Sequence, residues 1–165
     1  MSSWIACSGI EPVEGYLPQA SEVLLIAVGN VLRRDDGVAH WVLAKLELKP
    51  DEHAIEVQQL TPELALALAS YRAVVFIDAA VDRSEVTLEP VAILGKPPSL
   101  SHVFSPEALI ALASACGFRG EAWVCRIPVT DLGLGEGLSP QAQAHAEAAT
   151  ELLRRLLTEW RQRRK

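Results

Sequence analysis

The sequence has no apolar stretch long enough to cross a membrane. A bilayer-spanning helix needs roughly 20 consecutive apolar residues, and every apolar run in these 165 residues is shorter. The first twenty residues also lack the basic segment followed by a hydrophobic segment that marks a secretory signal. We therefore expect a cytoplasmic protein that does not associate with membranes.

Basic residues are also scarce. The chain has 15 Lys and Arg against 21 Asp and Glu, for a formal net charge of −6. The one basic cluster is the C-terminal run RRLLTEWRQRRK, which is typical of a solvated helix end where cations complement the helix dipole. Because binding to a phosphate backbone needs clustered cations, we expect no nucleic-acid partner.

Cysteines are few and badly spaced for most cysteine chemistry. Cys7, Cys116 and Cys125 form no CxxC pair, which argues against a zinc finger and against a disulfide framework. The sequence also lacks the GxSxG motif of many serine hydrolases. Cys125 lies in the middle of an apolar segment, where a thiol is usually an inert core residue. A serine or cysteine nucleophile is therefore not expected.

Alternating strand and helix patterns predict an α/β protein. Half of the residues are hydrophobic, and a chain of this length suits one domain. Residues 1–21 mix Ser, Gly and Pro without periodicity and predict a flexible N-terminal arm, leaving 22–165 as a single domain. We expect a three-layer α/β/α sandwich with a mostly parallel, twisted sheet of about five strands. The expected strands are 22–28, 53–60, 73–80, 121–129 and, more weakly, 85–94; the expected helices are 38–48, 61–71, 105–117 and 139–161.

Three of the expected helices begin in the same way. Thr61-Pro62-Glu63, Ser105-Pro106-Glu107 and Ser139-Pro140-Gln141 each place a hydroxyl, then proline, then an acid or amide. A hydroxyl at the N-cap and proline in the first turn satisfy or avoid free N–H groups, and the helix dipole favours an acid there. We therefore expect Glu63 and Glu107 to have structural roles.

Acidic residues follow two of the strands expected to be buried. Asp35 and Asp36 come shortly after the strand at 22–28, in the segment VGNVLRRDDG, and Asp78 is near the end of the strand at 73–80. Ligands of parallel sheets bind outside the carboxyl ends of the strands. The two segments therefore predict a ligand site at that edge of the sheet.

One of the four histidines is well placed to join these acids. His102 lies in a loop just before a helix, again at a sheet edge. The other three have less favourable positions: His40 lies within the first helix, His53 begins a strand, and His145 falls on an exposed-looking face of the last helix. We therefore take His102 as the candidate ligand.

Asp36, Asp78 and His102 together could bind a divalent metal. Carboxylates and imidazole suit zinc, nickel or manganese, and three protein ligands leave a position open for substrate. The competing interpretation is structural: Asp35 would cap the first helix and Asp78 would cap a turn. A dinucleotide site is least favoured, because the turn has only Gly29 and two carboxylates would face the pyrophosphate.

Several segments together resemble one known family. VGNVLRRDDGVA, QLTPELALALASYRAVVFIDAA, SHVFSPEALIALA and GLGEGLSPQAQ are similar to the hydrogenase maturation proteases, and the similarity runs from about residue 22 to 157. The combination of the Gly-Asn-x-Leu-x-x-Asp-Asp-Gly pattern with the later Asp-Ala and Ser-His segments is specific, although each piece alone is common.

The resemblance implies an aspartic-type endopeptidase. It would remove the C-terminal extension from the precursor of a nickel–iron hydrogenase large subunit after nickel insertion. The family's metal-contacting set matches Asp36, Asp78 and His102, which we take as both the metal ligands and the catalytic residues, with Asp35 as a helix-capping partner. Glu107, just downstream, could stand in for His102. The nickel would come with the substrate, and no organic cofactor is implied.

A second function remains open on the same frame. A metal-binding chaperone or regulatory module could use the same three ligands without cutting anything. Only the protease would shorten a nickel-containing precursor, so the two hypotheses differ in one product. A nucleotide-binding oxidoreductase, which would retain NAD on purification, is the third and least favoured hypothesis.

Overall fold

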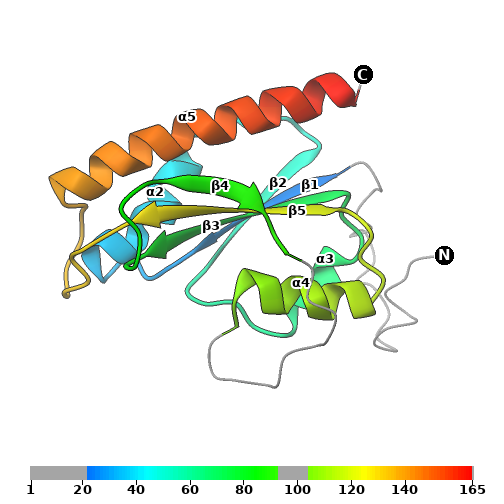
Figure 1. Cartoon of the computed structure of the whole chain (residues 1–165), viewed down its shortest axis with the longest axis horizontal. Helices are drawn as coiled ribbons and strands as arrows, with labels where there is room; N and C mark the ends of the chain where they lie inside the picture. Colours follow the sequence, from blue (N-terminus) through cyan, green and yellow to red (C-terminus); the bar gives the residue numbers. More distant parts are fainter. Residues whose placement is uncertain (1–21, 93–103, 165) are drawn as a thin grey trace.

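A five-stranded sheet crosses the middle of the molecule (Figure 1). The structure is a computed structural model and describes residues 22–92 and 104–164. The strand order is β2-β1-β3-β5-β4, in which β4 runs antiparallel to β5 at one edge and the other neighbours are parallel. The predicted mostly parallel sheet is thereby confirmed. The strands are β1 (Val23–Val28), β2 (Glu52–Val57), β3 (Ala73–Ala80), β4 (Thr87–Pro90) and β5 (Glu121–Pro128).

Helices cover both faces of this sheet. On one face α2 (Val38–Lys45) packs beside the long α5 (Pro140–Arg163), and on the other α3 (Leu64–Leu68) packs beside α4 (Pro106–Ala115) (Figure 1). A short 3-10 helix, η1 (Arg34–Gly37), connects β1 to α2. The α/β fold with helices on both sides of the sheet agrees with the predicted sandwich.

Side-chain alternation along the strands builds two separate cores. All six residues of β1 are buried, with Leu25 and Ala27 in the core under α2 and α5 and Leu24 and Ile26 in the core under α3 and α4. Burial on both faces explains why β1 reads as a continuous apolar run. The same alternation decides which face each polar residue of a strand must occupy.

The serine-proline starts of two helices cap as expected. The Ser105 and Ser139 hydroxyls accept hydrogen bonds from the backbone N–H groups of Ala108, at 3.0 Å, and Ala142, at 3.2 Å. The third start behaves differently, because α3 begins only at Leu64 and has no side-chain cap. There, Thr61 hydrogen-bonds to the Glu63 side chain instead.

The two cysteines that the structure describes are one free thiol and one bonded residue. Cys125 is fully buried in β5, and burial raises the pKa of its thiol to about 12, so it is an inert core residue. Cys116, which follows α4, is disulfide-bonded, so the expectation drawn from the cysteine spacing is wrong at this residue. Within the described ranges, no helix combines the length and the apolar composition that crossing a bilayer requires.

An ion-pair cluster fastens the end of α5 to the start of β2. The Glu52 side chain is completely buried and accepts hydrogen bonds from Arg161, at 2.6 and 2.8 Å, and from Arg164, at 2.7 Å. Burial alone would raise the pKa of Glu52, but these bonds and one from the Lys49 N–H lower it to about 2. The cluster therefore fixes the basic end of the chain against the sheet.

Replacing Glu52 by Gln should destabilise the fold by about 3 kcal/mol at pH 7, because one partner of a buried ion pair is lost. The pKa of Glu52 is lower in the folded chain than its ordinary value of 4.5. Its contribution is therefore present above pH 4.5 and is lost as the pH falls toward 2. Urea unfolding of both chains across this range measures the effect.

The matched control is E151Q, since Glu151 is an exposed residue of α5 with only surface ion pairs. Such pairs contribute at most about 1 kcal/mol. Equal effects of E52Q and E151Q would contradict the assignment of the Glu52 cluster as a main support of α5.

Candidate active site

The loop after β1 turns sharply at Gly29. Its φ is +146°, and a Cβ built there would lie 1.9 Å from the backbone oxygen of Asp36. The next N–H, that of Asn30, donates to Asp36 Oδ2 at 2.7 Å, and the Asn30 side chain accepts from the Leu32 N–H at 2.9 Å. The Gly-Asn pair of the motif is therefore what returns the chain and fixes the Asp36 carboxylate at the end of β1.

Asp35 is fully buried and joins this loop to the segment before α5. Its carboxylate accepts hydrogen bonds from the Ser139 N–H and Oγ–H, both at 2.8 Å, and from the N–H groups of Asp131, at 3.1 Å, and Thr130, at 3.3 Å. Burial raises the pKa of Asp35, but these bonds outweigh it and hold the pKa below its ordinary value.

The hypothesis that Asp35 caps the first helix is wrong. Neither η1 nor α2 has a side-chain cap. Asp35 instead binds Ser139, which is itself the N-cap residue of the last helix. Its role is structural, as the resemblance implies, but it acts on a helix about a hundred residues away in the chain.

A second set of contacts reinforces the joint between the two loops. Arg34 has a φ of +48°, and its guanidinium contacts the Leu134 carbonyl at 3.1 Å and Asp131 Oδ2 at 3.0 Å. Gly135 donates to the Leu32 carbonyl and accepts from the Arg34 N–H, both at 2.9 Å. The glycine-rich segment 131–137 therefore holds the acidic loop in place, and it does not only connect β5 to α5.

Asp78 lies within β3, beside the loop that carries Asp36. In the parallel register it is opposite Val28 of β1 and Arg126 of β5, and residues so paired project from the same face. Val28 packs in the core under α3 and α4, so Asp78 and Arg126 project toward α4. The hypothesis that Asp78 only caps a turn is wrong, because it is a strand residue.

The Asp78 carboxyl group has a high proton affinity. Burial raises its pKa to about 6, and the nearby charges of Asp36 and Glu107 add to the effect, while the Ala79 N–H and Arg126 oppose it. The structure therefore brings Asp36 and Asp78 into electrostatic contact at the carboxyl edge of the sheet. A raised pKa such as that of Asp78 is a frequent sign of a functional site.

Arg126 and Glu107 place two further charges near Asp78. Their side chains are 18% and 26% exposed, and Arg126 Nη2 lies 2.6 Å from Glu107 Oε1. Burial raises the pKa of Glu107, but the Arg126 bond and others hold it below its ordinary value. Sequence reasoning missed Arg126, although a cation inside the otherwise apolar segment EAWVCRIPV was an available signal. Glu107 is bound to Arg126, which leaves it poorly suited to stand in for His102.

His102 lies outside the described residues, so the proposed three-ligand set is not tested. Two of the other histidines are engaged elsewhere: His40 Nε2 donates to the Gly29 carbonyl at 2.7 Å, and His53 Nδ1 lies 3.1 Å from the Tyr71 hydroxyl. The prediction that His145 is exposed is wrong, since it is half-buried. Within 22–92 and 104–164, no three His, Cys, Asp or Glu side chains are grouped so that they could hold a metal ion.

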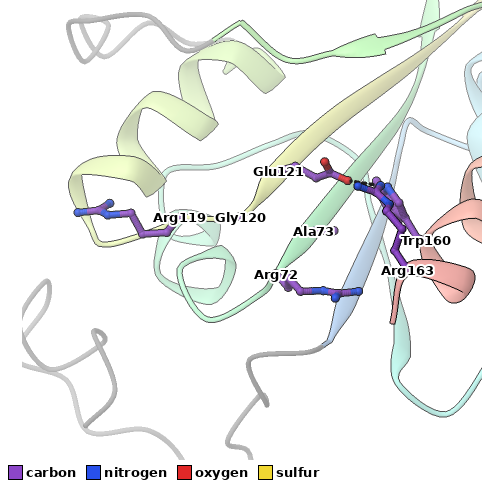
Figure 2. A pocket seen from close by; sticks show the side chains of 7 residues that line it. All are labelled: Arg72, Ala73, Arg119, Gly120, Glu121, Trp160 and Arg163. Carbon is purple, nitrogen blue, oxygen red and sulfur yellow. Dashed lines mark hydrogen bonds and ion pairs between the residues drawn. The ribbon is translucent and has the colours of Figure 1, made fainter. Parts of the chain in front are cut away.

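A pocket of about 280 Å³ lies at the opposite end of the sheet, where β3 and β5 begin (Figure 2). Three arginines are among its lining residues, but Arg163 pairs with Glu121 at 3.0 Å. Arg119 points away from the other side chains drawn and donates to the carbonyls of Ser114 and Phe118. Because Arg119 and Arg163 are both bound within the protein, we do not take this pocket as the catalytic centre.

Solved structures share this fold. The hydrogenase maturating endopeptidase HybD from E. coli aligns with a TM-score of 0.64 and 21% identity, over 84% of this chain and 93% of that one. The [NiFe] hydrogenase maturation protease HycI from Thermococcus kodakarensis gives 0.63 and 21%, over 84% and 93%. The hydrogenase 2 maturation peptidase from Thaumarchaeota archaeon SCGC_AB-539-E09 gives 0.60 and 22%, over 84% and 99%.

These matches show that the chain has the fold of hydrogenase maturation proteases. No protein-family model matches the sequence, and no curated protein matches it either. The family resemblance read from the motifs is thus supported by a structural match over most of the chain, at low sequence identity.

Replacing Asp35 by Ala should destabilise the protein by about 3 kcal/mol, because the donors on Thr130, Asp131 and Ser139 lose a fully buried acceptor. Hydrogen exchange should also rise in segment 130–139, which is fastened by that carboxylate. Urea unfolding and amide exchange measure the two effects. D36A is the control, since the Asp36 carboxylate accepts one N–H bond within the described part of the chain. An equal loss in D35A and D36A would contradict the structural role of Asp35.

Replacing Asp78 by Asn should stabilise the protein at pH 7 by about 1–3 kcal/mol. The folded pKa of about 6 exceeds the ordinary 3.8, so ionised Asp78 opposes folding fully above pH 6. The cost disappears below about pH 3.8, where both states are protonated. Urea unfolding at pH 7 and pH 3 measures this difference.

The control is D82N, since Asp82 is an exposed acid of the same type, where a change within about 0.5 kcal/mol is expected. A D78N chain that is less stable than the wild type at pH 7 would show that the Asp78 carboxylate supports the fold and does not strain it.

Proposed function

We propose that this protein is an endopeptidase that removes the C-terminal extension of a nickel–iron hydrogenase large-subunit precursor after nickel insertion, in the cytoplasm. The observation that carries the proposal is the pair Asp36 and Asp78: two carboxylates from different segments lie at the carboxyl edge of the sheet, near enough for the charge of Asp36 to raise the pKa of Asp78, and Asp78 has no ion-pair partner among the described residues. The shared fold gives this pair its context.

The proposed ligands are Asp36, Asp78 and His102. The Asp36 Oδ2 atom is occupied by the Asn30 N–H, which leaves Oδ1 as the atom for a cation. Asp78 is held beside it by the register of β3. His102 belongs to the chain segment that leads into α4, and Glu107 in the first turn of α4 acts electrostatically on Asp78. The substrate nickel, held by cysteine thiolates of the precursor, would complete its coordination with these three side chains.

Cleavage would then depend on nickel in the substrate. A carboxylate has two oxygens, so one can bind the cation while the other accepts a proton from the attacking water. The water oxygen bonds to the scissile carbonyl carbon, and the peptide C–N bond breaks as its nitrogen takes up a proton. Polarisation of the carbonyl by the substrate cation lowers the barrier, and no covalent acyl-enzyme is needed.

Substituting each ligand should abolish processing. We expect D36N, D78N and H102Q to cleave a purified nickel-loaded precursor at least about 100-fold more slowly than the wild type, as followed by the mass of the precursor over time. D78N is the most informative variant, because it is expected to fold at least as well as the wild type. D82N is the matched control and should cleave normally.

Full activity in one of the three ligand variants would remove that residue from the proposed site. A wild-type protein that binds the nickel-loaded precursor but never shortens it would instead support the metal-binding chaperone or regulatory module. Cleavage of a nickel-free precursor at the same rate would overturn the recognition of nickel.

A further inference from the structure

The Arg126–Glu107 ion pair stands beside the acid that the proposed mechanism uses. Arg126 has two carboxylates within its reach. Asp78 is its direct register partner on the neighbouring parallel strand, where side chains on one face lie about 5 Å apart. Glu107 approaches from the first turn of α4.

Arg126 binds only one of these two acids in the described structure. Its Nη2 atom lies 2.6 Å from Glu107 Oε1, while it forms no ion pair with Asp78. The positive charge of Arg126 nevertheless acts on Asp78 and lowers its pKa. The guanidinium therefore lies near Asp78 but is directed toward Glu107. The acid opposite Arg126 on β3 is therefore not the partner that Arg126 takes.

We propose that Glu107 is a positioning residue that holds the Arg126 guanidinium off Asp78, so that the Asp78 carboxylate stays open to the cation of the substrate. The purpose given to this arrangement rests on the proposed function, but the geometry of the Arg126–Glu107 pair is independent of that function. An arginine bound to Asp78 would occupy the carboxylate oxygens that a cation must reach, and Arg–carboxylate pairs are among the strongest of side-chain hydrogen bonds.

Glu107 is well held for this role. It lies in the first turn of α4, where the helix dipole favours a carboxylate, and the Ser105 side chain also hydrogen-bonds to it. The partial burial of both partners, with 18% and 26% of the side chains exposed, strengthens their attraction relative to an exposed pair. Arg126 therefore gains more from this fixed partner than from remaining solvated.

The competing interpretation is that the pair only clamps α4 to β5. Both interpretations predict that E107Q impairs the protein, since neutral Gln cannot hold the guanidinium as a carboxylate does. They differ in what a second substitution does. If Arg126 blocks Asp78 when released, removing Arg126 as well restores the open carboxylate. If the pair is only a clamp, the double variant still leaves α4 unfastened from β5, and Asp78 couples to Arg126 no more strongly in the E107Q chain than in the wild type.

The first test measures kcat/KM for the nickel-loaded precursor. We expect E107Q to lose about tenfold or more, the scale of a charge-assisted hydrogen bond of 1.4 kcal/mol or more, and E107Q/R126Q to recover most of that loss. A double variant no better than E107Q would overturn the proposal in favour of the clamp. An E107Q chain as active as the wild type would overturn it as well.

The second test needs no cleavage. A double-mutant cycle between D78N and R126Q, read as urea unfolding constants, measures the coupling of Asp78 with Arg126. It is made once in the wild-type chain and once in the E107Q chain. In the E107Q chain, where Arg126 is expected to pair with Asp78, we expect a coupling of about tenfold in the unfolding constant. In the wild-type chain we expect a clearly smaller coupling.

Equal coupling in the two chains would show that Glu107 does not control the choice of partner and would overturn the proposal. The two tests also separate the inference from the proposed function. If the wild-type protein fails to cleave the precursor, the proposed function fails, while the unfolding cycle still decides whether Glu107 keeps Arg126 away from Asp78.

Discussion

The buried carboxylate of Asp35 is the constraint on which the candidate site depends. It collects four hydrogen bonds from Thr130, Asp131 and Ser139, and so fixes the loop after β1 to the start of the last helix. Asp35 points into the protein, and the next residue, Asp36, lies at the edge of the sheet. There the Asn30 N–H donates to its carboxylate and orients it. Two adjacent acids therefore have different environments: Asp35 is fully buried, and Asp36 lies in the loop at the edge of the sheet.

The second acid of the site is positioned by the sheet itself. Parallel strands end at one edge, and the register of β1, β3 and β5 aligns Val28, Asp78 and Arg126 on one face. Burial and a neighbouring acid then raise the pKa of Asp78 to about 6. An acid that opposes folding in this way is characteristic of positions kept for function, because stability and activity often make conflicting demands at a site.

Local patterns were enough to predict the α/β class, the parallel sheet and the edge at which the acids gather. Continuous apolar runs revealed the buried strands, and Asp78 could be placed because it follows the apolar run AVVFI directly, near the end of its strand. The partner of Asp35 could not be predicted, since Ser139 is about a hundred residues away and the nearby helix start offered a local alternative. The same holds for Arg126, whose choice between two acids depends on strand register and on the packing of α4. His102 remains a prediction from the sequence.

The most direct test of this account is a crystal structure of the protein with bound nickel, located by anomalous diffraction. The account predicts a single strong peak within bonding distance of Asp36 Oδ1, an Asp78 carboxylate oxygen and the His102 imidazole. A nickel ion bound elsewhere, with the two carboxylates left without a cation or with His102 on another side of the molecule, would contradict it.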